Sequence, residues 1–311
     1  MSSLITVRAP GLQTTVQDLG RPGHGEIGVS PSGAADRTAL RLGNLLVGNA
    51  ESSAALEMTL LGGTFEFGAR STIALTGSDF GAALDGEPVD LWEAKEVRPG
   101  QVLACEASRG GARCYLCVAG GLNVPPVLGS ASTHLASGLG GWHGRALREG
   151  DSIPIGEFPG SFRERRLSAE TISIFAPRTR LRVTAGPHFE RFAESSRKLF
   201  FENSWTVSRQ SNRLGLRLEG PPLAPAGEIV SAGVGLGTVQ VTSDGQPIVL
   251  FVDQQTTGGY PQLACVASVD HSSLGQLSPS DEIAFELVEA GEAVRLLRAA
   301  ESRFDSGDLF A

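Results

Sequence analysis

Hydrophobic residues recur with a period of two along most of the chain, which is typical of half-buried β-strands. Between residues 54 and 89 this alternation appears in four short runs: AALEMTL, GGTFEF, STIALTG and AALDGEPV. The Asp85-Gly86 pair in the last run predicts a tight hairpin turn. Further strands are predicted over RCYLCVAGG (residues 113–121) and between Trp205 and about Leu287. The pattern predicts a mainly β fold.

A few segments change to the helical period. The clearest covers residues 32–49, where Ser32 is expected to cap the start of the helix. A second helix is predicted to begin at Pro187, and a third, expected to be shorter, covers residues 290–305. The charged segment GEFPGSFRERRLS (residues 156–168) is predicted to be a linker. We therefore expect two β-rich domains, residues 1–165 and 166–311.

The overall charge and hydropathy exclude some classes of function. The 311 residues carry a net charge of −8 with a pI near 5.2, which disfavours nucleic acid as a partner. No apolar run approaches the roughly 20 residues that a membrane span needs. The first residues, MSSLITVRAP, lack the layout of a signal peptide. The expectation is a soluble cytoplasmic protein with no membrane partner.

The cysteines and histidines do not form a predicted metal site. Cys114 and Cys117 form a CxxC motif within a predicted strand. Strand residues three apart point to opposite faces, which favours two buried apolar residues over a zinc or redox pair. The histidines have no metal-ligand spacing with one another. We predict that no metal is bound. For His188, at a predicted helix start, both a packing role and a ligand-binding role stay open.

Two stretches gather neutral hydrogen-bonding groups. VDQQTTGGYPQLA follows a run predicted to be buried and is too polar for a simple turn. Its candidate ligand-binding residues are Asp253, Gln255, Thr256, Thr257 and Tyr260. SRQSNRLGLRLEG, residues 208–220, places three donors and acceptors together, Gln210, Asn212 and Arg213. It is either a solvated turn or a site for a carboxylate or amide ligand. Loops between rigid strands are where binding residues concentrate.

A glycine-rich segment, GVGLG (residues 233–237), superficially resembles a phosphate-binding loop. It lacks the Lys-Ser/Thr ending and precedes a predicted strand, which argues against nucleotide binding. Gln240 on that strand is expected to point toward the same cleft as the VDQQTTGGYPQLA stretch. The long glycine-rich loop over residues 129–151 is predicted to be either functional or disordered.

Several phrases occur together in the order seen in one family: TVQDLGRPGHGEIGVSPSGAAD, YLCVAGGLNVPPVLGSASTHL, GGWHGRALREGD, SRQSNRLGLRLEG and DGQPIVLFVDQQTTGGYPQLA. Over about residues 4–287 the chain resembles the urea amidolyase-related family. That family includes the second subunit of allophanate hydrolase-like pairs, the C subunit of 5-oxoprolinase, KipA-like antagonists and the carboxyltransferase domain of urea carboxylase. The resemblance implies two cyclophilin-like β-barrel domains.

The resemblance also implies partners and cofactors. Members act with a KipI-like, allophanate hydrolase subunit 1-like protein, and the 5-oxoprolinase assembly adds a third, LamB/YcsF-like subunit. ATP is implied for the complex rather than for this chain alone. Biotin is implied only for the carboxyltransferase alternative and would arrive on another protein, because the chain has no biotin-accepting lysine motif.

Both implied substrates, 5-oxo-L-proline and urea, are small amides. This supports a pocket in which Asp253, Gln255 and Tyr260 are the catalytic candidates and Thr256 and Thr257 contact the substrate. Opposite them are expected three residues that bind the substrate: Gln210, Asn212 and Arg213, the last holding a carboxylate. Gln240 and His24 are further candidates. Family members often carry Tyr where this chain has His24, which allows a proton-transfer role there.

Three functions remain open. The first is the C subunit of an ATP-dependent 5-oxoprolinase, which hydrolyses 5-oxo-L-proline to L-glutamate. The second is a biotin-dependent carboxyltransferase or allophanate hydrolase-type protein acting on urea-like amides. The third is a KipA-like regulatory antagonist of a kinase inhibitor. The same scaffold serves all three.

Overall fold

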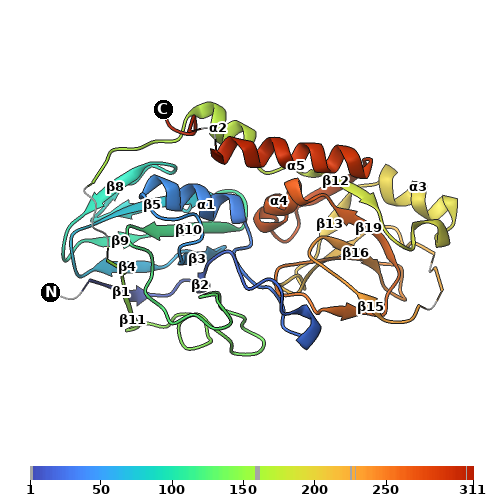
Figure 1. Cartoon of the computed structure of the whole chain (residues 1–311), viewed down its shortest axis with the longest axis horizontal. Coiled ribbons are helices and arrows are strands. Elements are labelled where there is room, and N and C mark those ends of the chain that lie inside the picture. Colours follow the sequence, from blue (N-terminus) through green and yellow to red (C-terminus); the bar gives the residue numbers. More distant parts are fainter. Residues whose placement is uncertain (1–2, 158–161, 225, 228, 306) are drawn as a thin grey trace. The chain divides into compact units, whose positions relative to one another are not determined.

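The computed structural model describes residues 3–157, 162–224, 226–227, 229–305 and 307–311, which form two compact units (Figure 1). The first unit comprises Met1–Arg21, Ser32–Phe175 and Leu309–Ala311; the second comprises Pro22–Pro31 and Ala176–Asp308. The predicted boundary after residue 165 falls inside the first unit, and part of the predicted linker lies outside the described residues. The ten residues that contain His24 belong to the second unit.

Two antiparallel sheets form the first unit. The six-stranded sheet has the order β11-β1-β4-β9-β6-β7 and the five-stranded sheet the order β2-β3-β10-β5-β8. Their bounds are β1 Leu4–Ala9, β2 Gln13–Gln17, β3 Ala55–Thr59, β4 Thr64–Phe67, β5 Ser71–Gly77, β6 Ala83–Leu84, β7 Glu87–Pro88, β8 Ala94–Val97, β9 Val102–Ala104, β10 Arg113–Val118 and β11 Ser152–Pro154. The predicted hairpin at Asp85-Gly86 is confirmed, because Leu84 pairs with Glu87 and both turn residues have positive φ. Apolar side chains of both sheets share one core.

Helix α1, Arg37–Leu46, packs on β5 and β10. The prediction that Ser32 caps this helix is wrong. Asp36 is the N-cap, and its side chain accepts a hydrogen bond of 2.9 Å from the amide of Ala39. A carboxylate at this position accepts a hydrogen bond from an otherwise unpaired amide. Its negative charge also interacts favourably with the positive end of the helix dipole. At Gly43 the contact is too close for any side chain, since a Cβ would lie 2.7 Å from the Sγ of Cys117.

The CxxC motif lies on β10, where both thiols are buried. Cys114 belongs to the core between the sheets, whereas Cys117 faces α1, with its Sγ 3.8 Å from the carbonyl oxygen of Leu40. The two side chains therefore point to opposite faces, as strand alternation predicts. Burial raises the pKa of both thiols, most strongly through loss of solvation.

The glycine-rich loop of residues 129–151 is tied to the rest of the first unit by Asp18. Its carboxylate accepts hydrogen bonds from the hydroxyls of Ser130 (2.6 Å) and Ser132 (2.5 Å) and from the amide of Ala131 (2.6 Å). Arg21 adds a bond of 3.3 Å to the carbonyl of Val127. These bonds hold the loop in a defined conformation, which argues against the disordered alternative.

The second unit is a closed seven-stranded barrel with the order β12-β19-β16-β17-β14-β13-β20. The strands are β12 Arg180–Ala185, β13 Trp205–Val207, β14 Gly215–Glu219, β16 Thr238–Val241, β17 Pro247–Leu250, β19 Gln262–Val266 and β20 Glu282–Leu287; β15 Ala232–Gly233 pairs separately with β18 Thr257–Gly258. In its core the rings of Phe200 and Phe285 stack with centroids 4.5 Å apart. The mainly β prediction is confirmed.

The short helices are α2 Ala169–Ile174, α3 Glu194–Glu202 and α4 His271–Gln276, with 3₁₀ turns η1 Gly25–Ile27, η2 Phe189–Arg191 and η3 Ser268–Asp270. The helix predicted from Pro187 begins instead at Glu194, because Phe192 is extended (ψ 135°) and separates η2 from α3. Helices α2 and α4 were not predicted, because each is too short for the helical period to be recognised in the sequence.

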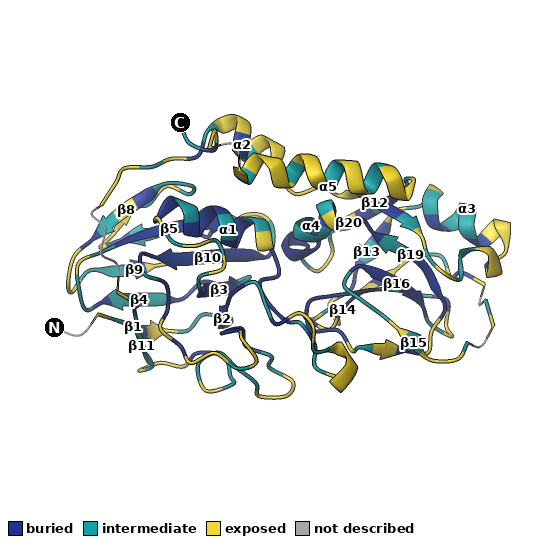
Figure 2. Ribbon diagram, viewed as in Figure 1, coloured by how far each residue is buried: buried dark blue, intermediate teal, exposed yellow. Residues whose placement is uncertain are grey.

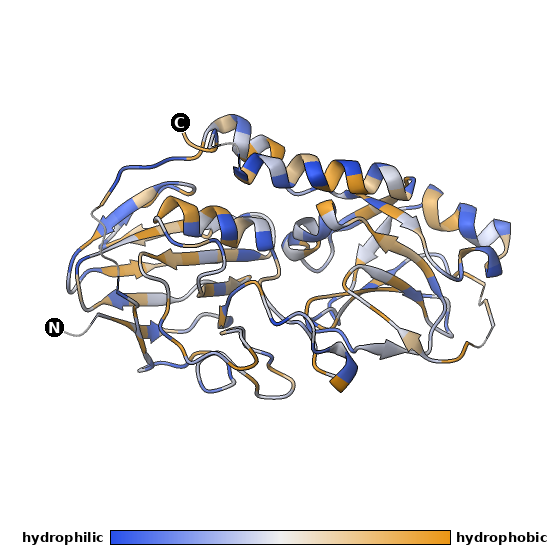
Figure 3. Cartoon of the chain, viewed as in Figure 1, coloured by the Kyte–Doolittle hydropathy of each residue, from blue (hydrophilic) through white to orange (hydrophobic). Residues whose placement is uncertain are grey.

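Helix α5, Ala290–Asp305, has the predicted bounds but is the longest described helix rather than a short one. None of its described residues is fully buried, and its polar and apolar residues alternate along the outer surface of the barrel (Figures 2 and 3). No helix in the described part of the chain is both long and apolar enough to cross a membrane.

Candidate functional site

The polar stretch that follows β17 is held in place by a second strand pair. β18 pairs with β15 in antiparallel register, with Gly233 opposite Thr257, and the amide of Val234 donates a 3.1 Å bond to the carbonyl of Thr256. The glycine-rich segment that starts at Gly233 is therefore the neighbour of the Asp253–Tyr260 loop. We call residues 253–260 the site loop.

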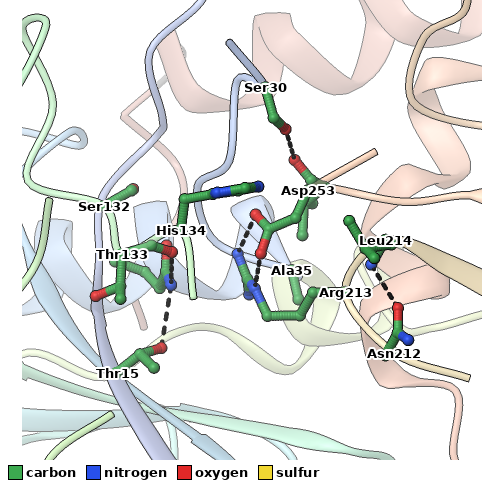
Figure 4. Close-up of polar contacts among 12 residues, drawn as sticks. Thr15, Ser30, Ala35, Ser132, Thr133, His134, Asn212, Arg213, Leu214 and Asp253 are labelled. Carbon is green, nitrogen blue, oxygen red and sulfur yellow. Dashed lines mark hydrogen bonds and ion pairs between the residues drawn. The ribbon is translucent and has the colours of Figure 1, made fainter. Parts of the chain in front are cut away.

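Arg213 and Asp253 meet because β14 and β17 are antiparallel neighbours, with Gly215 opposite Leu250. Just beyond these paired residues, the backbone amide of Asp253 donates a 2.8 Å bond to the carbonyl of Arg213. The Asp253 carboxylate also accepts two hydrogen bonds from the Arg213 guanidinium: Nε donates to Oδ2 at 2.8 Å and Nη2 donates to Oδ1 at 3.2 Å (Figure 4). Both side chains are more than nine-tenths buried. Arg213 was predicted to hold a ligand carboxylate, and its Nε and Nη2 instead hold the carboxylate of Asp253.

Asn212 and Gln210 precede Arg213 in the chain, and both are exposed. The Asn212 Oδ1 accepts a 2.8 Å bond from the amide of Leu214 (Figure 4). The backbone amide of Asn212 donates a 3.1 Å bond to the carbonyl of Gly215. These bonds close a tight turn, so the turn-forming alternative holds for Asn212. Gln210 keeps an exposed side chain, which leaves it able to contact a ligand.

Two buried glutamines support the site loop from the barrel. The Gln240 Nε2 lies 3.4 Å from the carbonyl of Tyr260, and the Gln262 Nε2 lies 3.5 Å from the carbonyl of Gly233. A Cβ at position 258 would come 2.5 Å from the Gln240 Nε2, so glycine is needed there. Gln240 is only 1 % exposed and acts as a support for the loop backbone.

Four other side chains of the loop are at least partly exposed. Gln255, Thr257 and Tyr260 are exposed, and Thr256 is partly exposed. Tyr260 is 44 % exposed, so part of its aromatic side chain is accessible to a ligand. Amides, hydroxyls and one aromatic ring suit the amide group of a small polar ligand.

His24 lies in the Pro22–Pro31 segment that belongs to the same unit as the site loop. The Ser30 hydroxyl donates a 3.2 Å bond to the carbonyl of Val252 (Figure 4), and Gly25 lies close to Thr256, whose Cγ2 would be 4.0 Å from a Cβ there. The partly buried His24 precedes η1 without a side-chain capping bond. The structure thus brings a distant part of the sequence beside the site loop.

His188 has a structural role. Its Nδ1 accepts a 3.2 Å bond from the amide of Gln262, and its own amide donates 3.2 Å to the carbonyl of the same residue. These two bonds support the packing role of His188. No group of three His, Cys, Asp or Glu side chains within the described ranges is arranged to hold a metal ion.

Residues 27–287 match the carboxyltransferase domain family, subdomains A and B. The chain belongs to this family. It is 40 % identical over 304 residues to the 5-oxoprolinase C subunit of Escherichia coli, and the match covers 97 % of each chain. It is 33 % identical over 308 residues to the urea amidolyase of Saccharomyces cerevisiae, covering 90 % of this chain and 16 % of that protein.

Among solved structures, the urea amidolyase of K. lactis superposes on this carboxyltransferase-family chain with a TM-score of 0.90 and 32 % identity. The match covers 100 % of this chain and 20 % of that one, so the chain spans a fifth of the larger protein. The suspected family is thereby confirmed for nearly the whole chain.

The glycine-rich segment does not fit the phosphates of ATP. Gly233 lies in β15, and the segment leads directly into β16, which begins at Thr238. A phosphate-binding glycine loop instead opens onto a helix N-terminus, whose amides and dipole hold the anion. No step of ATP chemistry is therefore assigned to these residues.

One residue of the site loop was not predicted. Gln254 is 4 % exposed, and its Oε1 is buried without a hydrogen-bond partner among the described residues. The sequence pattern shows a run of polar residues but not which of them turns inward, so no local signal distinguishes Gln254 from Gln255.

Proposed function

We propose that this chain is the C subunit of an ATP-dependent 5-oxoprolinase, active only with partner subunits. The observation that carries the proposal is the match to the 5-oxoprolinase C subunit of E. coli, which covers 97 % of both chains at 40 % identity. The partners would be a KipI-like protein and a LamB/YcsF-like protein. ATP would be bound and used in the complex.

The reaction hydrolyses a cyclic amide. A water oxygen bonds to the ring carbonyl carbon, the C–N bond breaks, and the nitrogen takes a proton to become the amino group of L-glutamate. We propose that Gln255 and Tyr260 contact the reacting amide, with Thr256, Thr257 and Gln210 around it. Asp253 would accept a proton from the water, since a carboxylate has about four lone-pair sites and Arg213 occupies two of them.

In this proposal Arg213 acts through Asp253. Its guanidinium orients the carboxylate by two bonds and supplies the opposite charge that a buried carboxylate needs. Asn212 shapes the turn that delivers Arg213, and Gln240 supports the loop backbone. His24, beside the loop, is a candidate for proton transfer to the leaving nitrogen.

The second candidate function is a biotin-dependent carboxyltransferase. The match to the carboxyltransferase domain family and the similarity to the yeast urea amidolyase support it. A carboxyltransferase would receive biotin on another protein, and the neutral amides and hydroxyls of the site loop suit the ureido ring. The KipA-like alternative would use the same surface to bind an inhibitor protein without turnover.

The test is purification of the tagged full-length chain with its native partners, followed by an assay with ATP and 5-oxo-L-proline. We expect ATP-dependent glutamate formation by the complex and none by the chain alone. Gln255→Leu and Tyr260→Phe should each lower kcat at least about tenfold, the scale of one transition-state hydrogen bond. Gln246→Leu is the matched control, because its side-chain amide bonds the backbone of Gly220, on another side of the barrel.

A co-purified biotinylated protein, together with silence toward 5-oxo-L-proline, would replace the hydrolase by the carboxyltransferase. Binding to an inhibitor protein without turnover of either amide would instead support the KipA-like role.

A further inference from the structure

The substrate of the proposed reaction carries a carboxylate, and Arg213 is already committed to another one. In 5-oxo-L-proline the carboxylate is attached to the ring, next to the lactam that reacts. Arg213 holds Asp253 through Nε and Nη2, and both side chains are more than nine-tenths buried. A carboxylate that binds a protein is held most specifically by the forked donors of an arginine. A second cation beside the site loop is therefore needed for the substrate.

The segments beside the site loop contain few charged residues. Three segments contact the loop, and all their residues are described: the β13–β14 hairpin (residues 208–214), residues 22–31 and residues 230–237. Together with the site loop they contain these Asp, Glu, Lys and Arg residues: Glu26, Arg209, Arg213 and Asp253. Arg213 and Asp253 neutralise each other, and the exposed Glu26 repels an anion. Arg209 is the cation that remains for an anionic ligand.

The register of the barrel places Arg209 at the end where the site loop begins. β13 is antiparallel to β14, with Val207 opposite Leu218, and β14 is antiparallel to β17, with Gly215 opposite Leu250. The connection from β13 to β14 therefore lies at the same end of the barrel as the chain that leaves β17. Arg209 is in the first connection, and the site loop starts in the second.

The backbone that carries Arg209 is held by hydrogen bonds, whereas its side chain is not engaged. The amide of Ser211 donates 3.1 Å to the carbonyl of Ser208, which closes a turn around Arg209 and Gln210. The amide of Ser208 donates 2.9 Å to the carbonyl of Arg217 on β14. The Arg209 side chain is exposed and makes no hydrogen bond or ion pair with another described residue. Its five N–H donors are available to a ligand.

We propose that Arg209 binds the carboxylate of the substrate through its guanidinium, while Gln210 beside it contacts the lactam. This assignment rests on the proposed function, because it takes 5-oxo-L-proline as the substrate. It makes Arg209 the residue that selects a carboxylate-bearing lactam over urea, which has no negative charge. The carboxylate does not react, so its contact stabilises the bound substrate and the transition state alike and acts on KM rather than on kcat.

The experiment uses the purified complex with its native partners and two ligands that share the lactam ring. 5-oxo-L-proline carries the carboxylate, and 2-pyrrolidinone lacks it. Calorimetric titration measures binding of each, and formation of glutamate or 4-aminobutanoate measures turnover. We expect wild type to bind 5-oxo-L-proline about tenfold or more tightly than 2-pyrrolidinone, the scale of one hydrogen bond between charged groups. A higher salt concentration should reduce this preference.

Arg209→Gln removes the charge and keeps an exposed polar side chain, so it should fold as wild type does. We expect it to raise the KM for 5-oxo-L-proline about tenfold, to change kcat little, and to leave binding of 2-pyrrolidinone unchanged. Arg209→Lys should restore part of the preference, because it keeps the charge without the fork. Arg217→Gln is the matched control. It removes the same charge from an exposed position on β14, within electrostatic range of Asp244, and should keep the wild-type preference.

The outcomes separate this inference from the proposed function. If wild type forms glutamate and Arg209→Gln keeps the preference for 5-oxo-L-proline, the inference is overturned and the function stands. If wild type forms no glutamate but prefers 5-oxo-L-proline to 2-pyrrolidinone, and Arg209→Gln loses that preference, the function fails and the carboxylate site stands. A wild-type complex without any preference between the two lactams, or an equal loss in Arg217→Gln, overturns the inference.

Discussion

Arg213 and Asp253, 40 residues apart, form a doubly bonded ion pair whose two side chains are only 6 % and 4 % exposed. The amide of Asp253 also donates to the carbonyl of Arg213. This relationship changes the interpretation of both residues. Arg213 orients a carboxylate of its own chain, and in the proposed function the substrate meets the neighbouring side chains of the site loop.

Removal of one partner of this pair should be far more damaging than removal of both. Arg213→Met leaves a buried carboxylate without its counter-charge, and we expect a loss of about 3–5 kcal/mol in the free energy of unfolding. Arg213→Met combined with Asp253→Leu should be clearly more stable than the Arg213→Met variant. Urea denaturation of the wild-type chain and the variants measures this. Additive losses would show that the two side chains do not interact.

The ion pair between Arg145 and Asp151 predicts a pH dependence of stability. The two side-chain bonds, of 2.7 and 2.8 Å, and the amide of Arg148 lower the pKa of Asp151 to about 2. The unfolded value is about 3.9. Since the folded pKa is the lower one, the stabilisation is present above about pH 4 and is lost as the pH falls toward 2.

The difference in unfolding free energy between wild type and Asp151→Asn measures this contribution, because other titrations cancel in the comparison. It should be constant from about pH 7 to about pH 4 and shrink below that. A difference that stays the same down to about pH 2 would contradict the assignment.

Two helical glycines should respond oppositely to alanine. A Cβ at Gly43 would lie 2.7 Å from the Sγ of Cys117 and 2.8 Å from the Oγ1 of Thr76, so Gly43→Ala should destabilise by about 1–3 kcal/mol through overpacking. Apart from its chain neighbours and the nearby backbone of α5, no described atom lies within 4 Å of the Cβ position of Gly291. Gly291→Ala should therefore stabilise by up to about 1 kcal/mol. Thermal unfolding of both variants gives the two signs, and equal signs would contradict the packing described for α1.

The three buried thiols, those of Cys105, Cys114 and Cys117, should be unreactive in the folded protein. Burial raises the pKa of Cys105 to about 12 and raises those of Cys114 and Cys117 as well. Because the thiolate is the reactive form, a disulfide reagent at about pH 8 should label these three only after denaturation. Cys265 is partly exposed and should react first. Rapid labelling of Cys114 or Cys117, located by mass spectrometry, would favour a redox or zinc role for the CxxC motif.

Local patterns in the sequence determined much of the fold. The period of two predicted the strands, Asp85-Gly86 predicted a hairpin, and the helical period of residues 290–305 predicted α5. Alternation along β10 predicted that Cys114 and Cys117 face opposite ways. Each of these features depends on neighbours within a few residues, so it is written in the local order of apolar and polar side chains.

Only the tertiary structure decided how the candidate site is built. The register between β14 and β17 turns Arg213 toward Asp253, and residues 22–31 leave the first unit to join the second, which brings His24 beside the site loop. The loop backbone turns Gln254 inward and leaves Gln255 exposed. These contacts join residues far apart in the chain or depend on the path of a single loop. No period encodes them, because they arise only when strands pair and the barrel closes.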